Sequence, residues 1–217
     1  MIMRVRTRSR SPKNGLRWLE TLLLVVGLAA VDYYIWVNAE TVVYQAYQEW
    51  KFDRTLQAPA GNVPSGGAEA RTPHTADEVI GRLEIPRLDI RAIVREGDGE
   101  GTLHHAVGHV PSTALPGDIG NVGFAAHRDT FFRPLRNIRK NDRIIVSTLH
   151  GTFEYLVQTT QIVNPDDVSV LKASASKELT LVTCYPFYYI GSAPHRFIVH
   201  AIQVAATPQT PPPQIGS

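Results

Sequence analysis

Short runs rich in β-branched and aromatic residues, separated by turn residues, fill the sequence from Asp77 to Val204. Such runs are typical of β-strands, and the glycine, proline, asparagine and aspartate residues between them are typical of turns. The expected strands are Val79–Ile85, Ile90–Arg95, Val122–Ala126, Arg143–Leu149, Thr152–Val163, Leu179–Cys184 and Arg196–Val204. Gly101–Ala106 and Phe131–Ile138 are expected to form short helices. About seven or eight strands in a region of this length predict a mostly β domain, either a closed barrel or a sandwich.

A long apolar stretch, Trp18–Val37, precedes this region. It reaches the ~20 residues that a helix needs to cross a bilayer, and aromatic residues stand at both ends, where the membrane interface favours them. All charged residues before it are basic, which predicts a cytoplasmic N-terminus and a chain that continues outside the membrane. A cleaved signal peptide ending near Val37-Asn38-Ala39 and a buried helix of a soluble protein are the alternatives. The length of the stretch and its one-sided charge favour a retained anchor.

The composition then divides the chain into five parts. We expect a basic cytoplasmic tail in residues 1–17, the anchor in 18–37, a juxtamembrane helix and a flexible linker rich in glycine and proline in 38–76, one folded domain in 77–206, and a disordered proline-rich tail in 207–217. The formal net charge is +2, and the basic excess lies in the first part. A nucleic-acid-binding surface is therefore not expected, because phosphate binding needs basic residues spread over a folded face.

Cys184 is the single cysteine of the chain and ends the apolar run Leu179–Cys184. A single cysteine forms no internal disulfide and is most often a small buried apolar residue, whose thiol is then inert. Here the next residues are Tyr185 and Pro186, where regular strand pairing has to stop. The position at a strand end favours an accessible thiol.

Two further reactive groups stand at the ends of apolar runs. His127 closes the run that begins at Asn121, and Arg196 opens the run after the loop that follows Cys184. Thiol, imidazole and guanidinium are therefore all candidates for one end of one sheet. Together they supply what acyl transfer by a cysteine needs, namely a nucleophile, a proton carrier and a fixed positive charge for the oxyanion. A structural histidine, and an arginine paired with a surface carboxylate, remain the alternatives.

Arg128 follows His127 directly, so in a strand its side chain points to the opposite face, and we expect it to pair with Asp129 or to face solvent. No aspartate or glutamate is placed in sequence to orient His127. We therefore predict no three-residue relay of the protease kind.

Several histidines raise the question of a metal site. His104, His105 and His109 lie in a glycine-rich segment and, with His127, offer imidazole ligands. Their spacing matches no helical zinc signature, and no second cysteine is present. We expect neither a metal nor a cofactor.

The segment Thr180–Cys184 resembles the signature of sortases, the membrane-anchored cysteine transpeptidases of bacterial surfaces. The arginine lies 12 positions after the cysteine (196 − 184) and the histidine 57 positions before it (184 − 127). The segments Gly108–Pro111, Ala114–Gly117 and Ala126–Phe132 are also similar to sortases, most closely to class D. The resemblance extends from Val79 to Val204. One departure is Ala125-Ala126, where a glycine is expected in one place.

The resemblance implies a closed eight-stranded sortase-type barrel with short helices, preceded by a transmembrane helix, with Cys184, His127 and Arg196 around a groove. It implies that the Cys184 thiolate cleaves a C-terminal sorting signal of the Leu-Pro-x-Thr-Gly type and forms a thioacyl enzyme. His127 would then transfer protons to and from the amines, and Arg196, helped by Thr183, would stabilise the oxyanion.

The resemblance also implies partners and a location. The partners are surface proteins that bear the signal and an amine acceptor from the cell wall or a pilin, and the location is the cell membrane, with a single span and an extracytoplasmic catalytic domain. Hydrolysis without transfer, and a β-barrel that only binds peptides, are the alternative functions.

Overall fold

The structure is a computed structural model that describes residues 12–57, 78–189 and 191–208. The chain divides into two compact units, residues 1–43 and 44–217. Helix α1 runs from Pro12 to Gln57 without a break, so the expected anchor and juxtamembrane helix are one continuous element. Its segment Arg17–Trp36 is long and apolar enough to span a membrane, and its side chains are exposed. Most of the predicted linker, residues 58–76, lies outside the described residues.

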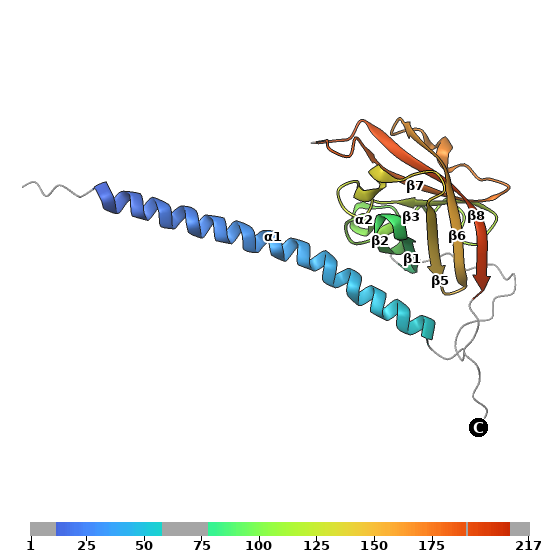
Figure 1. Cartoon of the computed structure of the whole chain (residues 1–217), viewed down its shortest axis with the longest axis horizontal. Coiled ribbons are helices and arrows are strands. Elements are labelled where there is room, and N and C mark those ends of the chain that lie inside the picture. Colours follow the sequence, from blue (N-terminus) through green and yellow to red (C-terminus); the bar gives the residue numbers. More distant parts are fainter. Residues whose placement is uncertain (1–11, 58–77, 190, 209–217) are drawn as a thin grey trace, which may run out of the picture. The chain divides into compact units, whose positions relative to one another are not determined.

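The larger unit contains a closed eight-stranded barrel (Figure 1). Its strands are β1 (Val79–Ile85), β2 (Ile90–Glu96), β3 (Val107–His109), β4 (Gly120–Ala125), β5 (Arg143–Thr148), β6 (Gly151–Val163), β7 (Lys177–Tyr185) and β8 (His195–Pro208). Around the barrel they follow the order β1-β2-β3-β4-β7-β8-β6-β5. The closed barrel is thus confirmed over the sandwich. Strand β3 was not predicted, because three residues are too few to show a periodic pattern.

Short helices lie in the connections. They are α2 (Glu100–His105) and the 3₁₀ helices η1 (Pro86–Leu88), η2 (Arg133–Asn137) and η3 (Val168–Leu171). The helices expected at 101–106 and 131–138 correspond to α2 and to the shorter η2. The prediction of a disordered tail from residue 207 was wrong at its start, since Thr207 and Pro208 still pair with Thr152 and Gly151 of β6. Proline fits the last position of a strand, where a backbone donor is not needed.

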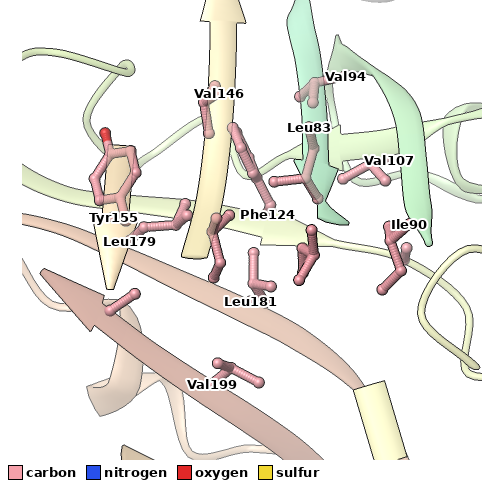
Figure 2. Packing of buried hydrophobic residues seen from close by; sticks show 14 of the residues in the cluster. Leu83, Ile90, Val94, Val107, Phe124, Val146, Tyr155, Leu179, Leu181 and Val199 are labelled. Atoms are coloured by element: carbon pink, nitrogen blue, oxygen red, sulfur yellow. The ribbon is translucent and has the colours of Figure 1, made fainter. Parts of the chain in front are cut away.

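The barrel core holds apolar side chains from every strand (Figure 2). Phe124 of β4, Leu181 of β7 and Val199 of β8 are fully buried there. Because side chains alternate between the two faces of a strand, the neighbours of Leu181 in β7 point to the outside of the barrel. This outer face of β4, β7 and β8 carries the candidate site.

Candidate active site

β4, β7 and β8 are neighbours in the barrel. β4 and β7 run parallel, so both end at the same edge of the sheet, and β8 begins at that edge because it is antiparallel to β7. The three apolar runs that end or begin with His127, Cys184 and Arg196 are these three strands. Their pairing therefore decides whether the three side chains come together.

Extended two residues past its last pair, the register of β4 and β7 sets His127 level with Cys184. The last strand pair is Ala125 with Val182, and the Ala126 N–H continues the ladder to the Val182 carbonyl oxygen at 3.2 Å. The residues paired in this register lie 57 positions apart, which is also the separation of His127 and Cys184. The histidine that follows β4 is thus brought beside the cysteine at the end of β7.

Cys184 and Arg196 are direct partners in the antiparallel pair of β7 and β8. Directly opposite residues of antiparallel strands place their side chains on the same face, with Cβ atoms about 4.5–5.5 Å apart. The thiol is free and half-buried. The Arg196 Nη1 donates to the His195 carbonyl oxygen at 3.2 Å, and within the described residues no carboxylate forms an ion pair with Arg196. The guanidinium therefore keeps donors for a bound carbonyl.

The thiol lies on the outer face of the barrel. Leu179 and Leu181 of β7 point into the core, so Val182 and Cys184 point outward. Ile198, the β8 partner of Val182, is fully buried outside the core cluster. Next to the thiol, the outer face of β7 and β8 thus carries the half-buried Val182 and the covered Ile198.

Thr183 lies on the opposite face of β7 from the thiol. Its side chain is only 2% exposed, and its hydroxyl donates to the Ala126 carbonyl oxygen at 2.8 Å. This contact joins the end of β7 to the residue before His127. The threonine side chain therefore has a buried partner and does not share the outer face with the thiol.

Glu100, at the start of α2, lies near the histidine. Its Oε2 is 3.7 Å from the His127 Nε2, and its side chain is 92% exposed, against 32% for the histidine. Sequence reasoning missed this carboxylate, because it reaches the site through the connection between β2 and β3 and no periodic pattern marks it. Such an exposed pair contributes little energy.

The connection between β6 and β7 covers the far end of the outer face. The Asn121 Nδ2 donates to the Val170 carbonyl oxygen of η3 at 3.0 Å, and the Thr180 hydroxyl donates to the Asn121 Oδ1 at 2.8 Å. Gly123 leaves room for this connection, since a Cβ there would lie 2.9 Å from the Leu171 Cδ2. η3 is therefore seated on the outer side of β4 and β7.

Asp167 caps the N-terminus of η3. Its Oδ1 accepts hydrogen bonds from the hydroxyl and the backbone N–H of Ser169, at 2.5 and 3.1 Å. These bonds hold the pKa of the Asp167 carboxyl below its usual value. The carboxylate form of Asp167 thus stabilises the start of η3.

The prediction for the Arg128 side chain was wrong. Instead of pairing with Asp129 or facing solvent, its guanidinium donates to the carbonyl oxygens of Pro186, Tyr189 and Gly191, at 3.1, 2.7 and 3.0 Å. The chain has left the strand at this point, so strand alternation does not apply to it. Arg128 binds the loop that joins β7 and β8.

His109 has a structural environment. It is 2% exposed, its Nδ1 lies 2.8 Å from the Glu96 Oε2, and its Nε2 lies 3.0 Å from the Ala114 carbonyl oxygen. In the described part of the chain, no three His, Cys, Asp or Glu side chains gather in a way that would hold a metal ion. The expectation of no metal stays a prediction.

The sortase domain family matches residues 83–204. Sortase D of Bacillus subtilis (strain 168) is 30% identical over 190 residues, which cover 84% of this chain and 96% of that protein.

Similar solved structures include the Sortase D5 transpeptidase of Clostridium perfringens, with 25% identity, a TM-score of 0.56 and coverage of 72% of this chain and 89% of that chain. Sortase E1 of Streptomyces coelicolor, solved with a tripeptide in its active site, has 29% identity, a TM-score of 0.54 and coverage of 61% of this chain and 91% of that chain.

Proposed function

Because this chain belongs to the sortase family of cysteine transpeptidases, we propose that Cys184, His127 and Arg196 carry its transpeptidation. One observation supports the assignment most strongly. It is the pairing of β4, β7 and β8, in which Cys184 is opposite Arg196 and the last β4–β7 pair lies two residues before His127 and Cys184. The reaction needs a nucleophile, a proton carrier and a fixed cation within reach of one peptide bond, and these residues provide them.

Cys184 attacks the carbonyl carbon of the scissile peptide bond as the thiolate. The tetrahedral intermediate collapses to a thioester, and His127, as imidazolium, gives its proton to the departing amine. The acceptor amine then attacks the thioester and passes a proton to His127, which restores the imidazolium, while the sulfur leaves as thiolate. A new peptide bond replaces the one that was cleaved.

Arg196 orients the substrate carbonyl and offsets the oxyanion charge, because a guanidinium is always charged and presents its N–H groups as a planar fork. For Thr183 we propose a positioning role in place of the oxyanion contact that the sequence suggested. Its buried bond to the Ala126 carbonyl oxygen supports this change.

The substrate that we propose is a surface protein with a C-terminal signal of the Leu-Pro-x-Thr-Gly type, and the acceptor is an amine from the cell wall or a pilin. The catalytic domain then comprises residues 77–206 and stands outside the cell membrane, while residues 1–17 stay in the cytoplasm. The half-buried Val182, on the same face of β7 as the thiol, supports binding of an apolar side chain of the signal near the cleavage point.

The test uses the full-length protein in detergent, a sorting-signal peptide and an added amine. Mass spectrometry is expected to find a thioester adduct on Cys184 and, after the amine is added, a peptide–amine conjugate. Hydrolysis without conjugate supports a thiol peptidase instead. If Cys184→Ala still cleaves the peptide, the assignment of the nucleophile is wrong.

A further inference from the structure

Arg128 binds the loop between β7 and β8 through three hydrogen bonds. Both Nη2 contacts, to the Tyr189 and Gly191 carbonyl oxygens, and the Nη1 contact to the Pro186 carbonyl oxygen fall on one loop. The guanidinium carbon also lies 5.8 Å from the centre of the Tyr189 ring. One side chain thus holds the loop at three backbone positions and one ring.

A second arginine of the same segment repeats the ring contact. The Arg136 guanidinium of η2 lies 5.5 Å from the centre of the Tyr188 ring. The Tyr188 and Tyr189 side chains are 73% and 47% exposed, so the barrel core does not fix them. The segment that follows β4 therefore supplies the contacts that order the two rings of the β7–β8 loop.

The two segments that Arg128 joins each carry a group of the site. Arg128 is the residue after His127, and the loop that it binds begins two residues after Cys184 and ends just before Arg196. At the start of this loop, Phe187 is fixed by ring contacts with Tyr185 and Phe197, at 6.0 and 5.3 Å. Beyond Phe187, the described contacts that hold the loop come from the arginines.

We propose that Arg128 is a positioning residue that ties the β7–β8 loop to the histidine segment, and so keeps the spacing of His127 and Cys184 and the aromatic edge of the peptide groove. The proposal rests on the proposed transpeptidation at Cys184. A displacement of about 1 Å in a reacting group can reduce the rate by about 100-fold, so a loose loop is costly for acyl transfer.

Arginine is required here because of its geometry. The planar guanidinium directs N–H groups at several fixed angles and can meet carbonyl oxygens in different directions while its face lies near an aromatic ring. A lysine ammonium at the same place keeps the charge but is a point donor on a flexible stem. Arg128→Lys therefore keeps the positive charge and removes the planar guanidinium geometry, so it tests the geometry alone.

The experiment compares full-length wild type, Arg128→Lys and Arg128→Ala, with Arg133→Lys as the matched control. Arg133 is an exposed arginine five positions later in the same segment. Amide hydrogen exchange of residues 187–193, the rate of iodoacetamide alkylation at Cys184, the melting temperature, and kcat and KM for a sorting-signal peptide are measured on each.

Both Arg128 variants are expected to exchange the loop amides about tenfold faster and to lower kcat/KM about tenfold or more. Their melting temperature stays within about 2 °C of wild type, because the contacts lie at the surface. Arg133→Lys stays within about twofold in every rate. An equal melting temperature with a large kinetic loss separates positioning from a general loss of structure.

If the amide hydrogens of the β7–β8 loop exchange at the wild-type rate in the Arg128 variants, Arg128 does not hold the loop. Faster exchange with unchanged kcat/KM would overturn the positioning role. If wild type itself forms no thioester, the proposed function fails, and exchange and alkylation then decide separately whether Arg128 holds the loop beside the thiol.

Discussion

Glu100 is the candidate for a carboxylate that orients the catalytic histidine, as in a protease triad, because its Oε2 lies 3.7 Å from the His127 Nε2. Its side chain is almost fully exposed, however, so water and salt screen the interaction. In a protease triad, a buried hydrogen bond from the carboxylate fixes the orientation of the imidazole. Glu100 makes no such buried bond and therefore does not fix the His127 ring.

We therefore expect Glu100→Gln to change kcat/KM for a sorting-signal peptide by less than about threefold, and the change to disappear at high ionic strength. Steady-state kinetics at low salt and at about 1 M salt check this, with the exposed Asp98→Asn as control. A loss above about tenfold that persists in salt would place the carboxylate in the catalytic machinery.

At this scale the sequence predicts reactive groups better than their neighbours. Cys184, His127 and Arg196 were found because each stands where an apolar run begins or ends, and strand ends are where side chains reach a groove. Glu100 and the partners of Arg128 lie in connections. Their meeting depends on the path of each loop in space, which the periodicity of the sequence does not encode.

Among the elements, the contact of β4 with β7 fixes the site. The Thr183 hydroxyl supplies a buried bond just where the regular ladder of this pair ends. Thr183→Val keeps the shape of the side chain and leaves the Ala126 carbonyl oxygen without this donor. We expect the free energy of unfolding to fall by about 1–3 kcal/mol.

We also expect Thr183→Val to lower kcat more than it raises KM, because the segment that carries His127 loses its link to β7. Denaturant titration and peptide kinetics measure both effects. Thr160→Val, on an exposed position of β6, is the control and should change neither by much. If Thr183→Val keeps the kcat of the wild type, the backbone hydrogen bonds between β4 and β7 are enough to position His127.

A second link between elements lies at the turn before β5. The Arg87 guanidinium of η1 binds Asp142, and the Arg139 N–H donates to the same carboxylate at 2.7 Å. The hydrogen bond from Arg87 holds the pKa of the Asp142 carboxyl below its usual value, although burial acts in the opposite direction. Asp142 is only 7% exposed.

Because the folded pKa is the lower one, this stabilisation is present above the pKa of an unfolded aspartate, about 3.9, and is lost as the pH falls through the folded pKa. Asp142→Asn should therefore cost about 1–3 kcal/mol of unfolding free energy at pH 7, and this cost should shrink as the pH falls below the pKa of an unfolded aspartate. Denaturant titrations across this range test it, with the exposed Asp89→Asn as control. A pH-independent difference would contradict the ionic origin.

The elements themselves were predictable to the extent that they are periodic. The long apolar runs became strands, but β3, with three residues, and the 3₁₀ helices η1 and η3 were too short to show a pattern. The end of β8 was misjudged because Pro208 marks a turn in sequence, whereas its pairing with Gly151 is a tertiary contact.

On the scale of the whole molecule, the sequence joins a segment suited to a bilayer to a folded enzyme. Arg17–Trp36 is the membrane-spanning candidate among the described residues, and sortases are membrane-anchored, so this helix supports anchoring of the chain by a single span. The charged residues before this segment are all basic, which favours a cytoplasmic N-terminus. The orientation that we propose then places the enzyme where surface proteins and cell-wall amines meet.

The single cysteine allows a direct test of this orientation. Cys184 is half-buried with a free thiol, so a small thiol reagent can reach it. A membrane-impermeant maleimide added to intact cells should label the full-length protein as completely as it does after the membrane is opened, because the proposed orientation places the thiol outside. Cys184→Ser should remain unlabelled in both conditions, which excludes reaction elsewhere, since the chain has one cysteine. Labelling that requires an opened membrane would place the catalytic domain in the cytoplasm, where it would meet neither the exported signal nor the acceptor amine.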